Sequence, residues 1–493
     1  MNYETVIGLE VHVQLQTRSK MFCGCPADYQ TAPPNSRVCP VCLGLPGSLP
    51  VVNRRAVEYT IMTGLALGCR IPGYSKFDRK NYPYPDLMKG YQISQFDLPL
   101  AEDGSLQIEV DGVSKPVGVM RVHLEEDAAK LLHFPEEPGD PHSLVDVNRA
   151  GSPLMEIVSE PDMRSPDEAR AYLTTLHSII QYLGVSAGNM QDGNFRCDAN
   201  VSIRPVGSEE FGTRTEIKNM NSFRSVYQAL NHEVERQRRV LEDGGSITQE
   251  TRGWVEERGV TVSQRSKEHA HDYRYFPEPD LPPLAIDPVW VEEIREKLPE
   301  LAGQRKWRFI EQYGLPPYDA DLLTGSRSMA DYFEETVALR SEAAPPLDGY
   351  AKNVSNWILG DLSRLMNLEG VAIGDVRVLP KHLSELLELV DSGTLSGTMA
   401  KTVLEEAFAT GQAPGKIVEE KGYSQISDSS VVDEAVVQAL AENPKAVADY
   451  LGGKETASKY LVGQVMKITR GQAKPDLALE LVVTALEAAR GGG

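Results

Sequence analysis

The sequence predicts an α+β protein in which an antiparallel sheet flanked by helices is followed by two all-helical parts. Three observations favour this class. At 493 residues the chain is too long for a single apolar core. Segments of alternating apolar and polar residues recur to about residue 290. From about residue 291 the pattern changes to amphipathic helices separated by Gly and Pro breaks. We therefore expect three domains, at 1–292, 293–408 and 409–493.

The first expected strand, VIGLEVHVQLQ at 6–16, has one apolar and one polar face. RVHLEEDAAK at 121–130 repeats this design, and Met120 is expected to join its apolar face. Carboxylates and imidazoles are ligands of divalent cations, so the two strands could share a metal ion. The alternative is a sheet whose second face is simply exposed to water. The polar faces carry Glu10, His12, Arg121, His123 and Glu125.

Three helices interrupt the strands of this first part. One is expected over 53–67 and another over 221–241, each followed by glycine. The best-marked helix follows Ser165, a favourable N-cap residue, and has Pro at its first position. Glu168 is expected to complete a capping box with Ser165, and Gly184 to end the helix.

Turn signals divide the stretch between 101 and 120. Asp103-Gly104 predicts a hairpin and Asp111-Gly112 a second turn, because Asp and Gly tolerate the positive φ that tight turns need. The preceding stretch, 75–100, is rich in aromatics, prolines and cations without a regular period. Irregular segments of that length are more often functional than not.

Two further strands, 195–204 and 214–218, also carry ionic faces, and one glutamate lies within the strand-like segment 146–159. Mixed charges at this density are typical of a pocket that holds a metal and an anionic substrate, although a solvated face stays the alternative. The candidate residues on these segments are Glu156, Arg196, Asp198, Glu216 and Lys218.

Four of the six cysteines lie close together, flanked by turn-forming residues. Their spacing is typical of a tetrahedral zinc site, and four thiolates would leave no open position, so the zinc would be structural. The alternative is four unligated thiols in a reducing compartment. The four residues are Cys23, Cys25, Cys39 and Cys42.

The net charge of −21 argues against general nucleic-acid affinity, yet one local segment is basic. Between 454 and 474 five cations accompany a single anion, Glu455. This pattern indicates a nucleic-acid contact, or else a solvated helix face. The five cations are Lys454, Lys459, Lys467, Arg470 and Lys474. No transmembrane run and no secretory signal are found, so we expect no membrane contact and a cytoplasmic location.

Several motifs together resemble the B subunits of the aspartyl/glutamyl-tRNA amidotransferases over the whole chain. They are VIGLEVHVQL (6–15), SKFDRKNYPYPD (75–86), GYQISQFD (90–97), LEEDAAK (124–130), NRAGSPLMEIVSEPD (148–162), RCDANVS (196–202), EIKNMNS (216–222) and DYRYFPEPD (272–280). The sequence has no Walker A motif and no glutaminase nucleophile motif. ATP use would therefore depend on an uncommon fold.

The resemblance implies a cradle domain, a helical domain and a YqeY-like tail that contacts tRNA. It implies an ATP-dependent carbon–nitrogen ligase with glutamine as amido donor, acting in a heterotrimer with the family's A and C subunits. The A subunit, a glutaminase, would release ammonia, and this chain would phosphorylate and amidate Asp on tRNA(Asn), Glu on tRNA(Gln), or both. The cognate aminoacyl-tRNA synthetase is a further partner that the resemblance suggests. The resemblance implies ATP and Mg²⁺ as cofactors; the structural Zn²⁺ rests on the cysteine spacing alone, since some members of the family lack the four cysteines.

The resemblance also assigns roles to individual residues. Mg²⁺ would be held by Glu10, His12 and Glu125, with help from Glu156 or Glu216. Positive side chains in the 75–100 stretch would stabilise phosphate charge, and polar residues of the later strands would orient the substrate or ammonia. The residues expected to stabilise phosphate charge are Lys80 and Lys89. Those expected to orient the substrate or ammonia are Arg196, Asp198 and Lys218.

Overall fold

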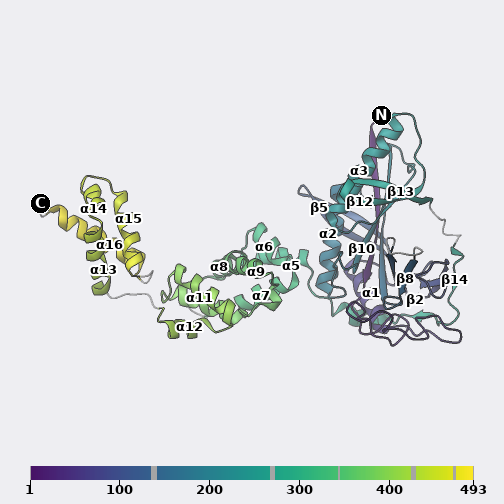
Figure 1. Ribbon diagram of the computed structural model, residues 1–493, viewed down its shortest axis with the longest axis horizontal. Helices are drawn as coiled ribbons and strands as arrows, with labels where there is room; N and C mark the ends of the chain where they lie inside the picture. The colour runs from purple at the N-terminus through teal and green to yellow at the C-terminus, as the bar shows by residue number, and fades with distance from the viewer. Residues whose placement is uncertain are drawn as a thin grey trace. The chain divides into compact units, whose positions relative to one another are not determined.

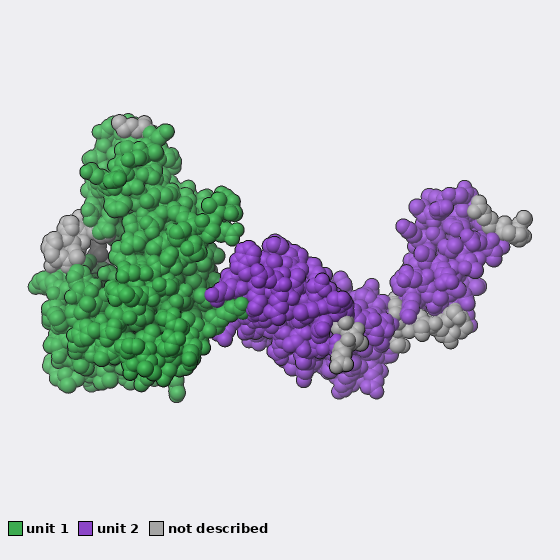
Figure 2. Space-filling view, turned by 180° about the vertical axis from the view of Figure 1, so that it is seen from behind, with its two compact units in different colours: residues 1–301 green, residues 302–493 purple. Residues whose placement is uncertain are grey.

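The computed structural model describes residues 2–134, 142–266, 273–341, 345–423, 429–469 and 473–491. Asp272, which begins one of the motifs, and Arg470 of the basic segment lie outside the described residues. The chain forms two compact units, residues 1–301 and 302–493 (Figure 2). No helix among the described residues is both long enough and apolar enough to span a bilayer.

An eight-stranded sheet organises the first unit, in the order β13-β12-β11-β10-β1-β9-β6-β5. Its neighbouring strands are antiparallel except for the parallel pair β11–β12. The expected antiparallel sheet is confirmed except at this pair, where helix α3 provides the long crossover that parallel strands require. The strands are β1 (Tyr3–Gln14), β5 (Ala101–Val110), β6 (Val113–Glu126), β9 (Pro153–Ser159), β10 (Phe195–Pro205), β11 (Thr215–Lys218), β12 (Glu250–Val255) and β13 (Val260–Ser266).

Three helices cover the apolar face of this sheet (Figure 1). They are α1 (Arg54–Ala66), α2 (Pro166–Leu183) and α3 (Phe223–Glu242), and they pack on β6, β5 and β10 respectively. The alternate residues Leu9 and Val11 of β1 are fully buried in the same cluster as Leu173 and Leu176 of α2. The strand periodicity of the sequence thus identifies this face, and α4 (Pro288–Arg295) adds Ile294 to the same core.

Short strands lie beside the opposite face. β3 (Asp78–Asn81) pairs with β4 (Tyr91–Ser94) and β14 (Phe276–Pro277), and β4 packs against β6. Arg79 in β3 donates to buried Glu278 over 2.6 and 2.9 Å, which fixes the segment that carries Lys80. The remaining short strands pair as β2 (Tyr74–Ser75) with β15 (Leu284–Ala285) and as β7 (Lys130–Phe134) with β8 (His142–Asp146).

Three local expectations need correction. Asp103-Gly104 is not a hairpin but lies within β5, where a Cβ on Gly104 would be 2.4 Å from Cys69 Sγ. Met120 is 42% exposed, because the register with β9 shifts between Val119 and Arg121. By contrast, the turn at Asp111-Gly112 is confirmed, with φ of 53° and 76°.

The third correction concerns the first turn of α2. The Ser165 hydroxyl accepts from the Glu168 N–H at 3.2 Å, as expected for an N-cap residue. The Glu168 carboxylate, however, accepts from the Arg164 N–H and from Lys115 Nζ, both at 2.7 Å, instead of closing a capping box with Ser165. Lys115 in β6 thereby ties the sheet to the start of α2.

The second unit is helical among its described residues and holds two apolar clusters. One runs from Phe309 to Ile417, and the other from Val432 to Leu486. The first cluster continues into α12, beyond the domain boundary expected at residue 408. The α-helices are α5 (Ala302–Tyr313), α6 (Pro317–Thr324), α7 (Arg327–Ala338), α8 (Leu347–Trp357), α9 (Ser363–Glu369), α10 (Pro380–Asp391), α11 (Gly397–Thr410), α12 (Pro414–Lys421), α13 (Ser429–Glu442), α14 (Pro444–Leu451), α15 (Thr456–Ile468) and α16 (Pro475–Gly491).

Candidate active site and metal centres

The polar face of the large sheet brings residues from five neighbouring strands together. Paired residues of antiparallel strands share a face, so the register decides which side chains meet. His12 of β1 lies between Arg196 of β10 and Glu156 of β9. Glu156 in turn pairs with His123 of β6. Segments far apart in the sequence therefore build one polar hollow.

His12, Glu125 and Glu156 form a compact group at its centre. Their ligand atoms all lie within 4.8 Å of one another, a separation that a single metal ion could bridge. His12 Nε2 is 3.4 Å from Glu156 Oε2 and 3.7 Å from Glu125 Oε1. Ser94 of β4 donates to the other oxygen of Glu125 at 3.1 Å, which fixes that carboxylate.

His123 completes the surroundings of this group. It is 2% exposed, and its Nε2 lies 3.2 Å from Glu156 Oε2 and 3.9 Å from Glu125 Oε2. Burial raises the pKa of Glu156, but attraction to His123 and His12 outweighs burial and holds this pKa well below its usual range. Burial lowers the pKa of His12, but Glu156 and Glu125 outweigh it, so this pKa is raised.

Glu10 does not belong to this group of three. Its carboxylate accepts from Asn200 Nδ2 at 2.8 Å and lies on the side of Asp198 and Glu216. Burial, followed by repulsion from Glu156, Glu216 and Asp198, raises the pKa of Glu10. The sequence analysis expected Glu10 to share an ion with His12 and Glu125. In the structure the third residue of that group is Glu156.

Lys218 of β11 anchors the second acidic group. Its ammonium is 2.5 Å from Asp198 Oδ2 and 3.6 Å from Glu216 Oε1. Glu216 also accepts from the Thr251 hydroxyl at 2.8 Å. Burial lowers the pKa of Lys218, but Asp198 and Glu216 outweigh it, so the pKa is raised and the side chain stays charged.

Lys80 and Lys89, expected to act together, are placed differently. Lys80 lines the hollow beside the rings of Tyr273 and Tyr82, whose centroids are 5.4 and 5.9 Å from its nitrogen. Burial lowers its pKa, but Glu125 and other neighbours outweigh burial and raise it. Lys89 instead pairs with the buried carboxylate of Glu126 and is not among the residues that line the hollow.

The hollow has two adjoining parts, with volumes of about 320 and 410 Å³. His12, Lys80, Asp198 and Lys218 line both parts. Buried polar atoms without a hydrogen-bond partner in the described structure gather along its walls, as expected where a substrate or ion would satisfy them. They are Asp86 Oδ1, Arg121 Nε, His123 Nδ1 and Arg196 Nε.

Sequence reasoning assigned no role to some of these lining residues. The alternation placed His123 on the same strand face as Glu125, but the expected set of Mg²⁺ ligands did not include it. Asp86 and Tyr275 lie in irregular segments without a period; both belong to motifs of the resemblance, but no role was assigned to them. Their position depends on the short strands beside the large sheet.

The four cysteines Cys23, Cys25, Cys39 and Cys42 form a second candidate metal centre, with their sulfur atoms within 4.8 Å of one another. A hydrogen bond from the Cys23 thiol lowers the pKa of Cys42 to about 5, which favours a thiolate ligand. The donor set therefore fits a closed tetrahedral site.

Backbone hydrogen bonds connect this cysteine loop to the acidic end of β6. Lys20 N–H donates to Cys25 O at 2.9 Å, and Met21 N–H donates to Gly151 O at 2.7 Å. Gly151 N–H then donates to Asp127 O at 2.9 Å. Gly151, which takes part in the last two of these bonds, has a φ of +81°, in the left-handed region that favours glycine. A short chain of contacts thus joins the two candidate metal centres.

The described lysines of the basic segment in the tail are exposed, and one of them lies near a carboxylate. Lys459, Lys467 and Lys474 are exposed, whereas Lys454 lies 3.7 Å from Asp449 of α14. Lys454 and the 54% exposed Tyr460 border a hollow of about 490 Å³.

Comparisons with known proteins agree with this architecture. Residues 5–292 match the family model described as the GatB/GatE catalytic domain, and residues 331–486 match the GatB domain. A protein of Dehalococcoides mccartyi (strain CBDB1) is 58% identical over 98% of this chain and 99% of its own length. Similar proteins of Carboxydothermus hydrogenoformans and Caldicellulosiruptor saccharolyticus are 56% and 54% identical, over 97% and 99% of this chain and 98% and 100% of their own lengths.

All three relatives are named as the B subunit of aspartyl/glutamyl-tRNA(Asn/Gln) amidotransferase. The identity extends over both units, so the resemblance seen in the sequence motifs is confirmed. The chain belongs to the GatB family of tRNA amidotransferase subunits.

Proposed function

We propose that this chain uses ATP to activate the side-chain carboxylate of misacylated Asp-tRNA(Asn) or Glu-tRNA(Gln), and then amidates it. The observation that carries the proposal is the group of His12, Glu125 and Glu156 beside the ammonium groups of Lys80 and Lys218 in one hollow. The names of the relatives support this substrate class.

The chemistry explains why carboxylates and cations are needed together. A carboxylate is a poor acyl donor because its leaving group would be oxide. Transfer of the γ-phosphoryl group of ATP to the carboxylate makes phosphate the leaving group and releases ADP. Ammonia then attacks the acyl carbon, phosphate leaves, and the amide loses a proton. Phosphoryl transfer depends mainly on positioning and on neutralising charge.

Each residue of the hollow has a defined part in this proposal. Glu125 and Glu156 would hold Mg²⁺ through carboxylate oxygens, the ligands that this ion prefers, and His12 would add a nitrogen donor, since the three donors already converge. Bound Mg²⁺ supplies positive charge for the ATP phosphates. Lys80 would stabilise phosphate oxygens, and Lys218, held by Asp198, would orient the aminoacyl group or ammonia.

Lys89 has no part in this proposal, because Glu126 already neutralises it outside the hollow. Glu10 and Glu216 would keep Lys218 and its surroundings charged and ordered. We do not assign either of them to the same ion as His12.

Partners complete the reaction. The chain would act in the cytoplasm within a heterotrimer that also contains the family's A and C subunits. It would receive ammonia from the A subunit, a glutaminase, since the sequence has no glutaminase nucleophile motif of its own. Charged tRNA, together with its synthetase, would be the remaining partner.

We also propose that three parts of the chain have separate functions. The sheet-rich part through residue 301 would hold the chemistry. The helical cluster through Tyr423 and the cluster that begins after it would contact tRNA, the last through Lys454, Lys459, Lys467, Arg470 and Lys474. The exposure of the lysines at 459, 467 and 474 supports such a contact.

The test is Glu125→Gln, measured in the assembled complex with charged tRNA, ATP and ammonium chloride. We expect ATP-dependent amide formation to be abolished while tRNA binding stays unchanged. Glu109→Gln removes the same charge at an exposed position of β5 and is the matched control. Full activity of the Glu125 variant would refute the metal assignment. If the parent complex bound tRNA without forming amide, a tRNA-binding scaffold would be the better description.

Zinc in the cysteine loop is a separate proposal. Cys39→Ser should lower the zinc content of the purified protein from about one equivalent to near zero, as four ligands become three. Cys69→Ser is the control, because Cys69 is a buried core residue away from this loop. Equal metal content in parent and Cys39→Ser would contradict the four-cysteine site.

A further inference from the structure

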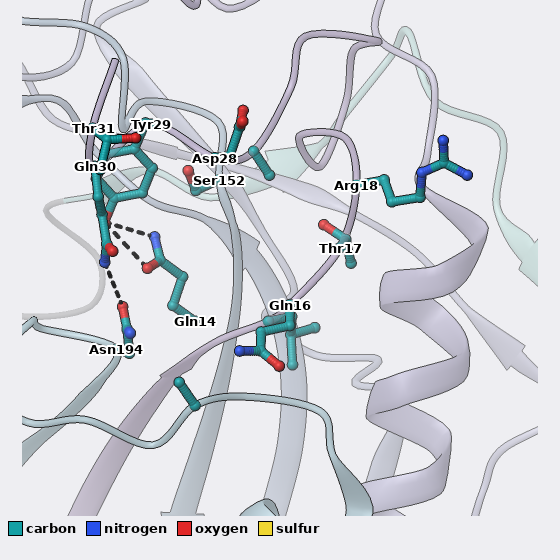
Figure 3. A pocket seen from close by; sticks show the side chains of 13 residues that line it. Gln14, Gln16, Thr17, Arg18, Asp28, Tyr29, Gln30, Thr31, Ser152 and Asn194 are labelled. Atoms are coloured by element: carbon teal, nitrogen blue, oxygen red, sulfur yellow. Dashed lines mark hydrogen bonds between the residues drawn. The ribbon is translucent and has the colours of Figure 1, made fainter. Parts of the chain in front are cut away.

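A third hollow, of about 410 Å³, lies at the end of β1 (Figure 3). Gln14 lines it from the last position of β1 and Gln16 from just beyond, Ser152 precedes β9, and Asn194 precedes β10. Residues 27–31 of the cysteine loop close its other side. None of the residues that line this pocket has a role in the proposed reaction.

Strand register places the pocket next to the proposed active site. Along β1 the residues of one face are Glu10, His12 and Gln14, and His12 lines the catalytic hollow. The neighbouring strands β10 and β9 show the same arrangement. Arg196 and Leu154 line the hollow, and Asn194 and Ser152, each two residues away on the same face, line the pocket. One step of two residues along a strand is about 7 Å. The pocket therefore lies one strand step from the lining of the hollow, along the same sheet face.

The chemistry changes over that one step from ionic to neutral. Gln14 and the Tyr29 hydroxyl exchange hydrogen bonds at 3.1 Å, and Gln30 Nε2 donates to Asn194 Oδ1 at 3.3 Å (Figure 3). The Ser152 hydroxyl is buried, with the residue 1% exposed, and has no hydrogen-bond partner in the described structure. An unsatisfied buried hydroxyl in a pocket wall indicates a group to be bound.

The rim adds a single available cation. Arg18 is exposed, lies at the end opposite Gln30, and forms no ion pair within the described ranges (Figure 3). Asp28, the acidic residue of the lining, is 3.4 Å from Arg37, which offsets its charge. The pocket thus combines carboxamides and a tyrosine inside with one arginine at its edge.

We propose that this pocket binds an adenosine moiety next to the reacting groups. Gln and Asn carboxamides recognise the N6 and N7 edge of adenine, a tyrosine ring offers a stacking surface, and an arginine suits a flanking phosphate. A volume of about 410 Å³ lies within the range of small-ligand sites. The inference rests on the proposed function, whose two substrates both carry adenosine: ATP and the 3′ end of the tRNA.

In both substrates the adenosine is close enough to the reacting group for one to lie in the pocket and the other in the hollow. The reacting carboxylate of an aminoacyl-tRNA is separated from the terminal adenosine only by the aminoacyl side chain and the ester. The γ-phosphate of ATP is separated from its adenosine by two phosphates. Both separations are short chains of a few atoms beyond the ribose, and Gln14 of the pocket lies one strand step, or about 7 Å, from His12. The experiment has to distinguish the two sources.

Gln14→Leu tests the pocket, because it removes the carboxamide at similar size. Gln107→Leu on the exposed edge of β5 is the matched control. The assembled complex is assayed with charged tRNA, ATP and ammonium chloride. We expect KM to rise about tenfold for one substrate, as for loss of a base-edge contact, with kcat changed less than threefold. A raised KM for ATP identifies the nucleotide, and a raised KM for charged tRNA identifies the tRNA end.

Direct binding gives an independent readout. Adenosine monophosphate and the trinucleotide CCA are titrated against the parent complex, Gln14→Leu and Asn194→Ala, with the dinucleotide CC as reference. The proposal expects one probe to bind the parent and to bind both variants about tenfold more weakly. Unchanged KM values together with unchanged binding of both probes would overturn it. A parent complex that forms no amide would refute the proposed function, and the binding arm would still decide on the pocket.

Discussion

Lys80→Met is expected to remove most of the catalytic rate without preventing substrate binding. Lys80 lies in the hollow with Glu125 and Glu156, and the attraction of these carboxylates raises its pKa, so the charge is present at working pH. At about 4 Å and an effective dielectric constant of about 20, an ammonium attracts a unit negative charge by about 4 kcal/mol. Part of this attraction already exists before the transition state.

The expected loss follows from the part that develops during the reaction. Removing one group that stabilises developing charge typically lowers kcat by about 100- to 1000-fold, and we expect that range for Lys80→Met. Lys80→Arg should recover part of the rate, because it keeps the charge. Lys297→Met is the matched control, since Lys297 is exposed after α4.

The assay measures single-turnover amide formation with ATP, charged tRNA and ammonium chloride, which removes dependence on glutamine hydrolysis. Binding of charged tRNA and thermal unfolding are recorded in parallel. A Lys80→Met variant that is folded, binds tRNA, and keeps kcat within threefold of the parent would refute the assigned role.

Three further changes test the folds of the two units. Burial raises the pKa of Glu334, but hydrogen bonds from two arginines of α5 outweigh it and lower this pKa, so the carboxylate stabilises the fold above its unfolded pKa. Glu334→Gln should therefore lower the urea midpoint at pH 7, and the difference from the parent should shrink as pH falls through the folded pKa. Gly104→Ala should destabilise the protein by about 1–3 kcal/mol, because its Cβ would lie 2.4 Å from Cys69 Sγ; an unchanged urea midpoint would contradict this close approach. Asn53→Ala should cost about 0.5–2 kcal/mol, since Asn53 caps α1 and donates to Ser19 O at 2.9 Å, and circular dichroism during urea unfolding would measure the loss.

Strand alternation predicted the large sheet well because each strand buries one face against helices. Glu10, His12 and Glu125 were placed on a polar face by this period alone, and the structure has them there. Which of them meet depends on register between strands that are more than a hundred residues apart. No local pattern encodes that register, so Glu156 could not be preferred over Glu10 beforehand.

Two residues lie in surroundings that the sequence did not predict, and the cause is tertiary in both cases. Asp103-Gly104 has the composition of a hairpin turn, yet its glycine is needed for the close approach of Cys69. Lys89 has the charge and position of a phosphate-binding residue, but it is already paired with Glu126, which a sequence period cannot show. In both cases a tertiary contact determines what the residue does.

The hydrogen bonds from the cysteine loop through Gly151 to Asp127 affect how chelation experiments should be interpreted. A chelator that strips the four cysteines would loosen a neighbour of the carboxylates at the end of β6 without touching them. Inhibition by such a chelator would then report mechanical support, and not a metal that takes part in the reaction. If the cysteines bind zinc as proposed, only reagents that spare that ion can reveal which metal the chemistry itself requires.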